Sequence, residues 1–450
     1  MTSPPHGREL LAALYEAALA AVAPEPLVHS ALADLDAHPD QRVWLFAFGK
    51  AAPAMANGAV SALRRSLHTI AGGVVVAPEP GPPPFSTVRT AVGDHPLPGE
   101  RSFAAARLVG ETASSVRADD AVVVLISGGT TSLIASPVRD VTTQDLVQLF
   151  VQLMDAGLEI GAMNAVRKRF LRWGAGRLAV ALAPARAHVL LLSDVPGDAP
   201  ADIGSGPCVP DEWTARDIAS LLRRAGLLER LAPSLREHLS SAMRGMTGET
   251  PKPGHPAFAH VSTRVVGSNA LALAGALAGA RTLGLHAERG AHALTGEAAR
   301  CGDDIAEALV RRASRGQRGC VVWGGETTVS MAAPPGDAQR ARTAASMTDA
   351  GGGRCQELAL AAARVLATSG ESASRISLLA AGTDGRDGPT DAAGAFVDAA
   401  LWQRMHDAGA DPEAALRLHR SFAALDAAGA LFRRGPTGTN VMDLVIGVVE

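Results

Sequence analysis

The feature that most restricts the fold of this sequence is a series of short, wholly apolar runs that recur along its 450 residues. A glycine-containing turn and an Ala/Leu-rich segment follow each run. Strands without polar alternate positions are typical of parallel strands covered by helices on both faces. The pattern therefore predicts an α/β fold with βαβ connections. The runs are WLFAFGK at 44–50, GGVVVAP at 72–78, AVVVLISGG at 121–129, HVLLLSDVPGD at 188–198, RVVGSNA at 264–270, CVVWGGE at 320–326 and SLLAAGTDG at 377–385.

The length of the chain predicts two domains, because a single hydrophobic core seldom grows to this size. The segment GMTGETPKPGHPAFAHV at 245–261 is dense in Pro and Gly and interrupts both helix and strand. We expect an N-terminal α/β domain over 1–250 and a C-terminal α/β domain over 251–450. One sheet can still borrow a strand from the other half of the chain.

Composition and charge exclude several classes of protein. The net charge is −3, the chain has no basic tract, and it has five Trp, one Tyr and ten Phe. Nucleic acid is therefore not an expected partner. The four cysteines are scattered without a CxxC pair, which argues against a zinc ribbon or a disulfide framework.

The N-terminal segment 1–26 contains Glu9, Glu16 and Glu25 within its apolar stretch. It is typical of an amphipathic helix ended by prolines and not of a secretion signal. The uncharged apolar stretches are too short to cross a bilayer. We expect a cytoplasmic protein with no membrane partner.

Polar residues follow several of the expected strands, and in open α/β sheets ligands bind at the carboxyl ends of strands. Ser127, Gly128, Gly129 and Thr130 come between the strand AVVVLI and a helix, so their backbone amides are candidates to bind a phosphate. The segment is not a Walker A sequence, because no Gly-Lys-Ser/Thr follows. A tight turn from strand to helix is the alternative.

A lysine and two aspartates follow other strands of the first half. Lys50 ends one strand and opens a helix, where an ammonium group can meet a transferred phosphoryl group, although a solvated lysine is the simpler interpretation. Asp194 and Asp198 flank a Pro-Gly turn, which suits Mg²⁺ or acceptance of a hydroxyl proton, with an Asx-type turn as the alternative. Ser205 and Gly206 add possible anion contacts.

The second half repeats this arrangement. A glycine-rich segment follows the strand CVVW, Asp384 follows the strand SLLAA, and Arg354 opens the helix CQELALAAA. Arg354 can contact phosphate with help from the helix dipole, or it can only brace its loop. The candidate nucleotide contacts in the glycine-rich segment are Gly324, Gly325, Glu326 and Thr327.

Taken together, these segments resemble the glycerate 2-kinase family whose C-terminal half is called the MOFRL domain. The resemblance extends from 48 to 444. The matching motifs, in order, are FGKAA at 48–52, HPLP at 95–98, SGGTTSL at 127–133, NAVRK at 164–168, SDVPGD at 193–198, SGP at 205–207, GGETTV at 324–329, GGRCQE at 352–357, GTDGRDGPTDAAGA at 382–395, GPTGTN at 435–440 and GTNVMDL at 438–444.

The resemblance implies transfer of the γ-phosphoryl group of ATP, with Mg²⁺, to the 2-hydroxyl of D-glycerate or a related small hydroxy acid. It implies a Rossmann-like, mostly parallel N-terminal sheet, a MOFRL-type C-terminal domain and an active site in the cleft between them. Lys50 and Arg354 match the family's catalytic cations, and Asp194 matches the first aspartate of SDVPGD. We assign Asp194 as the candidate base or metal-linked carboxylate, and expect a monomer or homodimer.

The sequence departs from the family pattern at two places. After NAVRK the family continues His-Leu-Ser and then Lys-Gly-Gly, and its GGR motif continues with Asn. A histidine, a serine, a lysine and an asparagine are therefore missing. A small packing residue is the preferred interpretation of the cysteine, although a helix start beside an arginine lowers thiol pKa values. The replacements are Arg169-Phe170-Leu171, Gly174-Ala175-Gly176 and Cys355.

Three alternatives to a D-glycerate kinase remain open at this stage. The departures at 169–176 and Cys355 can change the acceptor. Hydroxypyruvate reductase is a label that family members have carried, but no GxGxxG turn with an acidic ribose-binding residue is present. The third alternative is a non-catalytic paralogue that binds a ligand, against which the retained Lys50, Asp194 and Arg354 argue.

Overall fold

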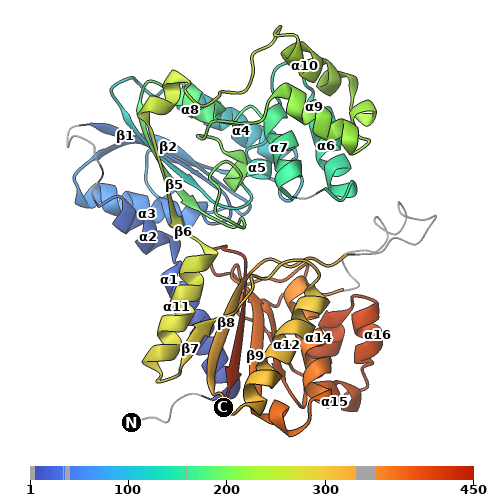
Figure 1. Ribbon diagram of the computed structural model, residues 1–450. Helices are drawn as coiled ribbons and strands as arrows, with labels where there is room; N and C mark the ends of the chain where they lie inside the picture. Colours follow the sequence, from blue (N-terminus) through green and yellow to red (C-terminus); the bar gives the residue numbers. More distant parts are fainter. Residues whose placement is uncertain (1–5, 34, 36–40, 159, 331–350) are drawn as a thin grey trace. The chain divides into compact units, whose positions relative to one another are not determined.

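The structure is a computed structural model that describes residues 6–33, 35, 41–158, 160–330 and 351–450. It contains two compact units, each built on its own six-stranded sheet (Figure 1). The parallel-sheet unit is Pro24–Gly267. The mixed-sheet unit is Met1–Ala23 together with Ser268–Glu450.

The parallel-sheet unit has the strand order β3-β2-β1-β4-β5-β6, and every neighbouring pair is parallel. All six residues of β4 are buried, as expected for a strand covered on both faces. The strands are β1 Arg42–Phe48, β2 Thr69–Ala77, β3 Val88–Val92, β4 Ala121–Ile126, β5 Arg186–Leu192 and β6 Val261–Gly267.

Buried apolar side chains form, among the described residues of this unit, at least two hydrophobic clusters. One packs helices against the sheet, and another lies among α6, α7, α9 and α10, which form a helical layer beside it (Figure 1). The helices are α2 Pro24–Ala31, α3 Ala52–Arg65, α4 Glu100–Ala113, α5 Thr130–Leu133, α6 Thr143–Asp155, α7 Ile160–Phe170, α8 Arg177–Leu182, α9 Ala215–Arg224 and α10 Pro233–Met243; the short 3₁₀ segments are η1 Ile203–Ser205, η2 Leu228–Arg230 and η3 Pro256–His260.

The strand order reverses direction between β1 and β4. The chain runs outward from β1 through β2 to β3, and then crosses back to place β4 on the other side of β1. Phe48 pairs with Ile126, so the loops after these two strands begin side by side. In doubly wound sheets this switch point is where ligands bind.

The mixed-sheet unit has the strand order β11-β10-β9-β12-β8-β7. Strand β12 is antiparallel to both β8 and β9, so its first residue, Asp443, lies opposite Gly325 and Gly382 at their carboxyl ends. The strands are β7 Ala287–Arg289, β8 Gly319–Gly325, β9 Ile376–Gly382, β10 Gly394–Asp398, β11 Leu431–Phe432 and β12 Asp443–Val449. The predicted α/β class with two domains is confirmed, with a wholly parallel first sheet and a mixed second sheet.

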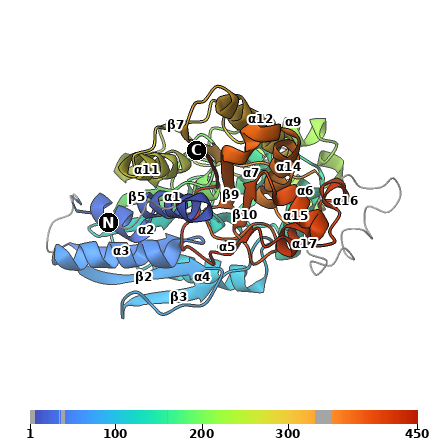
Figure 2. The same cartoon turned by 90° about the horizontal axis from the view of Figure 1, so that it is seen from below.

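Helices cover both faces of the mixed sheet, with α1 and α11 side by side on one face and α12 and α14 on the other (Figures 1 and 2). A Cβ at Gly275 of α11 would lie 2.5 Å from the Ala21 Cβ of α1, so the close approach of these helices requires glycine. The helices are α1 Gly7–Ala21, α11 Asn269–Thr282, α12 Ala298–Ser314, α14 Arg354–Thr368, α15 Leu401–Asp407, α16 Pro412–Arg417 and α17 Ser421–Ala427, with the 3₁₀ segment η4 Gly370–Arg375.

The predicted division at 1–250 and 251–450 needs two corrections. Strand β6 follows the Pro- and Gly-rich segment, yet it pairs with β5 and completes the first sheet. Helix α1 opens the chain, yet it packs against α11 in the mixed-sheet unit. Both corrections arise from pairing over long sequence distances, which local composition does not encode.

The helical stretch Gly7–Ala31 meets the length and hydropathy requirements of a membrane span, with 44% of its apolar window buried. Such a match is weak, because core helices of soluble proteins meet the same requirements. In α1 the side chains of Leu11, Leu14 and Tyr15 are fully buried within the unit. These contacts explain its apolar face by packing.

Tyr15 links α1 to the carboxyl end of β9. Its hydroxyl donates a hydrogen bond of 2.6 Å to the carbonyl oxygen of Gly382, and burial raises its pKa far above the ordinary value. The side chain is therefore a neutral donor that anchors this strand end.

We expect Tyr15→Phe to lower the free energy of unfolding by about 1 kcal/mol, because the buried Gly382 carbonyl loses the shorter of its two hydrogen bonds and keeps only that from the Gly385 amide at 3.2 Å. Urea denaturation measures the change. Leu283→Ala, an exposed substitution just after α11, is the control and should change stability by less than about 0.5 kcal/mol. Equal midpoints for wild type and Tyr15→Phe would contradict a stabilising role for the hydroxyl.

Candidate active site

The loops after β1 and β4 are joined at the switch point by backbone hydrogen bonds. The Lys50 amide donates to the carbonyl of Gly128 at 2.9 Å, and the Ser127 amide donates to the carbonyl of Phe48 at 2.9 Å. These bonds fix the backbone of Lys50 against the Ser127–Thr130 loop. The lysine turn and the candidate phosphate loop therefore lie side by side.

The Ser127 side chain braces the turn that carries Lys50. Its hydroxyl donates to the Phe48 carbonyl at 3.2 Å and accepts from the Ala51 amide at 3.1 Å, and the residue is fully buried. Gly49 has φ +115°, and a Cβ there would lie 2.2 Å from Ser127 Oγ. The local structure therefore requires glycine before the lysine, whose own residue is half-buried.

Hydroxyl groups connect the β4 loop to Ser205. Thr130 Oγ1 donates to the Ser127 carbonyl at 2.7 Å, and the hydroxyls of Thr131 and Ser205 lie 2.8 Å apart. Ser205 has φ +67° and is followed by Gly206 at φ +56°, so the chain makes a tight left-handed turn here. The structure thus brings together two loops that the sequence indicated separately.

Asp194 and Asp198 follow β5, the next strand in the sheet. Both are half-buried, and Asp198 has φ +54° in the turn after Pro196 and Gly197. Ser193 fixes the start of this loop, since its amide donates to the Gly267 carbonyl at 2.9 Å and its hydroxyl to the Val195 carbonyl at 3.2 Å. Two carboxylates therefore lie one strand away from the Ser127–Thr130 loop.

Within the described residues, no group of three or more His, Cys, Asp or Glu side chains is arranged to hold a metal ion. Mg²⁺ is commonly bound through one or two carboxylates and the phosphates of a nucleotide, with water completing its shell. Asp194 and Asp198 fit that mode and do not form a self-sufficient metal cage.

Arg354 of the mixed-sheet unit is held by two carboxylates. Its Nε and Nη2 donate to the two oxygens of Asp443 at 2.5 and 3.0 Å, and its Nη1 lies 2.5 Å from Glu326 Oε1. Burial lowers the pKa of Arg354, but attraction to Asp443 and Glu326 outweighs it, so the net pKa is raised. The guanidinium is permanently charged and oriented, and a bidentate pair fixes its plane.

The start of β12 is itself anchored. Asn269 Nδ2 donates to the carbonyls of Val441 at 2.8 Å and Asp443 at 3.1 Å. The side chain of Asp443 is 4% exposed, whereas that of Arg354 is 36% exposed. The aspartate is therefore a buried support and the arginine presents a face to solvent.

Asp387 caps helix α14, which begins at Arg354. Its carboxylate accepts from the amides of Cys355 at 3.1 Å and Gln356 at 2.8 Å. Burial, with repulsion from Asp443, raises the pKa of Asp387 to about 7, although the two amide bonds and Arg354 act in the opposite direction. The capping group thus titrates near neutral pH.

Cys355 is a packed, neutral thiol. The residue is 2% exposed, and burial together with Asp443 and Asp387 raises the pKa of the thiol well above its ordinary value. The structure favours the packing interpretation over a reactive thiolate.

Other predicted residues of this unit lie at the same strand ends as Arg354. Thr327 is buried after β8, and Asp384 Oδ1 accepts from the Arg386 amide at 3.0 Å in the turn after β9. Thr437 Oγ1 donates to the Thr383 carbonyl at 2.6 Å, which ties that turn to the segment before β12. The carboxyl ends of β8 and β9 therefore bring together three predicted side chains: Glu326, Asp384 and Arg354.

One departure from the family pattern, Arg169, belongs to a buried ionic cluster at the end of α7. Arg169 has no exposed surface and pairs with Glu249, and Lys168 Nζ lies 3.0 Å from the buried Asp211. Arg177 donates to the carbonyls of residues 168, 169 and 171, so its guanidinium caps the C-terminus of α7. These cations are committed to structural partners.

This cluster adjoins the Ser205 turn. The amide of Ala175 donates to the Ser205 carbonyl at 2.9 Å, and the amide of Gly176 donates to the Gly206 carbonyl at 2.8 Å. Substitutions at 169–176 can therefore shift the predicted binding residues Ser205 and Gly206 through these two backbone hydrogen bonds.

The sequence reasoning did not single out two residues that hold site or cluster side chains in the structure: Glu249 and Asp443. Asp443 had only a weak signal, a carboxylate at the first position of the apolar run DLVIGVV. Its partner Arg354 lies 89 positions earlier. Only the antiparallel pairing of β12 with β8 and β9 shows that Asp443 lies at the same end of the sheet as Arg354.

The fold and these residues place the chain among two-domain α/β proteins whose polar groups gather at strand ends. Residues 10–240 match the domain of unknown function DUF4147, and residues 319–443 match the MOFRL family. The chain belongs to the MOFRL/DUF4147 glycerate kinase family. The resemblance inferred from the motifs is confirmed.

Relatives cover nearly the whole chain. The D-glycerate 2-kinase of Thermotoga maritima is 33% identical, and the alignment covers 100% of both sequences. A protein of Agrobacterium vitis, provisionally named a hydroxypyruvate reductase, is 36% identical over 97% of this chain and 93% of its own length. The crystal structure of the Thermotoga maritima glycerate kinase superposes with a TM-score of 0.81 at 32% identity, covering 98% of this chain and 99% of that one.

We expect Gly49→Ala to destabilise the protein by about 2–4 kcal/mol, because the new methyl group overlaps Ser127 Oγ at a positive φ. Thermal or urea unfolding measures the loss. Gly81→Ala is the matched control, since a Cβ at Gly81 meets nothing within 4 Å. Similar stabilities for the two variants would contradict the proposed fit of Gly49 against Ser127.

Asp387 predicts a pH dependence of stability. Its pKa rises from an ordinary value of 3.8 to about 7 on folding, so between these values the folded state holds a proton that the unfolded state has lost. Stability is therefore highest below about pH 4 and falls as pH rises to about 7, by roughly 4 kcal/mol at most from this group.

The measurement is the urea midpoint of wild type and Asp387→Asn from pH 4 to 8. The asparagine does not titrate, so the difference between the two curves isolates this carboxylate. We expect the wild type to lose stability relative to the variant as pH rises. A constant difference would show that Asp387 keeps an ordinary pKa.

Proposed function

We propose that the protein is an ATP-dependent kinase that phosphorylates the 2-hydroxyl of D-glycerate or a related small hydroxy acid. The observation that supports this most strongly is the hydrogen-bonded pairing of the Lys50 turn with the Ser127–Thr130 loop at the β1/β4 switch point. Phosphoryl transfer needs placement and charge neutralisation more than covalent participation by the protein. A fixed lysine beside a glycine- and hydroxyl-rich loop supplies both.

In the proposed reaction, the acceptor hydroxyl attacks the γ-phosphoryl group of ATP and ADP leaves. The loop binds phosphate oxygens through the backbone amides of Gly128 and Gly129, while Thr130 holds the turn by donating to the Ser127 carbonyl. The Thr131–Ser205 hydroxyl pair orients the neighbouring loop. Lys50 neutralises charge on the transferred group. Asp194 accepts the proton of the acceptor hydroxyl.

Mg²⁺ is the expected companion of ATP, and Asp194 and Asp198 would hold it. Bound there, it would neutralise phosphate charge. The half-buried position of both carboxylates and the donor chemistry suit this role.

Arg354 is proposed as the second catalytic cation. A guanidinium has five N–H donors, and Asp443 and Glu326 engage three of them among the described residues. We assign the other two, which have no partner among the described residues, to a phosphate or to the acceptor carboxylate. Because Asp443 fixes the plane of the group, little side-chain entropy is lost when a ligand binds.

A changed acceptor is a second candidate, favoured by one observation. The departures at Arg169, Leu171 and Gly174 lie in the segment whose amides hold the Ser205 and Gly206 carbonyls. A shift of that turn would alter the shape of the acceptor pocket without affecting Lys50. Cys355, the buried residue that follows Arg354 in α14, can act in the same way.

Hydroxypyruvate reduction is a weaker candidate, supported by the name of the Agrobacterium relative. The turn after β1 is Gly49-Lys50-Ala51, which lacks the fingerprint of a dinucleotide site. Oxidation of NADH or NADPH by hydroxypyruvate at a useful rate would favour this reading over a kinase.

The test is ADP release with Mg-ATP and a panel of small hydroxy acids that includes D-glycerate. We expect Lys50→Ala to lower kcat by about 100-fold or more, because one charge-stabilising group is lost. Arg65→Ala is the control, since this exposed arginine ends α3, the helix that Lys50 precedes. It should leave turnover unchanged.

Each outcome identifies one candidate. Turnover of D-glycerate that depends on Lys50 supports the proposed function, and turnover of another acid alone supports the changed acceptor. Absence of turnover, with no thermal stabilisation by Mg-ATP, would contradict a kinase and favour a non-catalytic binding protein.

A further inference from the structure

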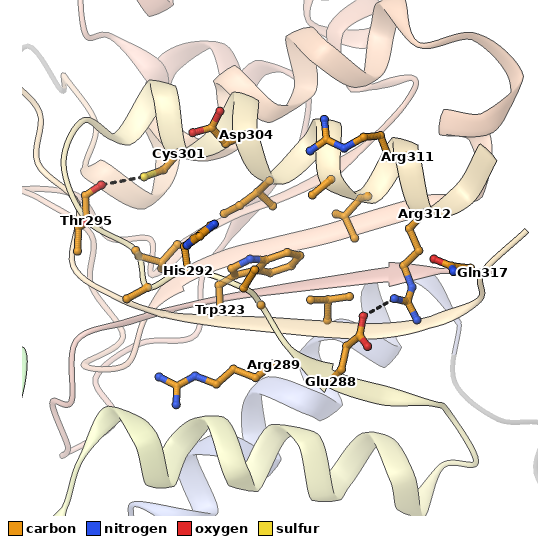
Figure 3. A pocket seen from close by; sticks show the side chains of 18 of the residues that line it. Glu288, Arg289, His292, Thr295, Cys301, Asp304, Arg311, Arg312, Gln317 and Trp323 are labelled. Atoms are coloured by element: carbon orange, nitrogen blue, oxygen red, sulfur yellow. Dashed lines mark hydrogen bonds and ion pairs between the residues drawn. The ribbon is translucent and has the colours of Figure 1, made fainter. Parts of the chain in front are cut away.

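A groove of about 830 Å³ lies at the edge of the mixed sheet, between α12 and the segment that runs from β7 to Thr295 (Figure 3). Its volume falls in the range of about 300–1,000 Å³ that is typical of small-molecule sites. None of the residues assigned above to phosphoryl transfer lines it. The site therefore calls for a separate explanation.

The floor of the groove is apolar. It is made by side chains that are each less than 10% exposed, and Figure 3 shows the indole of Trp323 near its centre. A planar, partly apolar ligand would cover this floor. The floor residues are Leu294, Ile305, Leu309, Val321 and Trp323.

The walls of the groove are cationic. Four arginines line it against two carboxylates, Glu288 and Asp304, in a chain whose overall net charge is −3. Arg312 pairs with Glu288 and the exposed Arg311 with Glu307, whereas among the described residues no carboxylate pairs with the exposed Arg289 or Arg315. The lining arginines are Arg289, Arg311, Arg312 and Arg315.

One wall of the groove is continuous with the strand end that carries Glu326. The Leu294 amide donates to the Gly324 carbonyl at 3.0 Å, and the Glu326 amide donates to the Leu294 carbonyl at 3.0 Å. Cys301 Sγ, which lies 3.0 Å from the Thr295 carbonyl, ties the same segment to α12. A ligand in the groove would thus contact the segment that positions Glu326, the partner of Arg354.

We propose that this groove binds a nucleoside phosphate, with its base on the apolar floor and its phosphates on the arginines. An apolar floor with cationic walls complements a molecule that is planar at one end and anionic at the other. The proposal rests on the proposed function only for the source of the nucleotide. Because the phosphates of the reacting ATP are assigned to the Ser127–Thr130 loop, the groove is proposed to hold a second nucleotide that acts on the Glu326–Arg354 pair.

The experiment titrates full-length protein with ADP that carries a fluorescent N-methylanthraniloyl group on its ribose. We expect Arg289→Ala and Arg311→Ala each to weaken binding about tenfold, because each removes one charge-assisted contact. Arg300→Ala, an exposed substitution on α12 outside the groove, is the matched control and should bind as wild type does. Unchanged affinity in both groove variants, or no binding to wild type, would overturn the proposal.

A second arm identifies the source and separates this proposal from the kinase assignment. If the groove holds the reacting nucleotide, the groove variants raise KM for ATP by the same factor and one ADP binds per chain. If it holds a second nucleotide, two bind and KM for ATP is unchanged. Binding that depends on Arg289 and Arg311 without turnover of any acid would support the groove and contradict the kinase.

Discussion

Burial of both faces of the two sheets is the constraint on which the rest of the structure depends. Helices cover each side, so polar groups within the strands would lose their hydration without replacement. At the ends of the strands the backbone turns, and polar side chains can gather there. Lys50, Asp194 and Arg354 all occupy such positions. The location of the candidate chemistry thus follows from the same apolar runs that determine the fold.

Charged groups in this protein fall into two kinds. Arg354 is oriented by carboxylates yet keeps a solvent-facing surface, which suits binding of an anion. Arg169 and Lys168 are almost wholly buried, with Glu249 and Asp211 as partners. A buried pair that loses one partner is strongly destabilising, whereas its net contribution to stability can be small. The replacement at Arg169 is therefore half of an ion pair with Glu249, beside the retained Lys168–Asp211 pair.

The fold was largely predictable because strands and helices are encoded locally. The runs at 121–129 and 377–385 form β4 and β9, and the Ala-rich segment at 270–284 forms α11. What local patterns do not encode is pairing across the chain. The sheet to which β6 belongs, the position of α1, and the contact of Asp443 with Arg354 all depend on partners tens to hundreds of residues away.

The parallel-sheet unit is inserted between α1 and α11, and this has a consequence for synthesis on the ribosome. Helix α1 emerges before the inserted unit, and its packing partner α11 follows only after that entire unit. Strand β12, central in its sheet, comes after every other strand in chain order. The inserted unit can therefore fold during translation, whereas the mixed-sheet unit can complete its sheet only after β12 has been synthesised. The Arg354 guanidinium is therefore oriented only after β12, which carries Asp443, has left the ribosome.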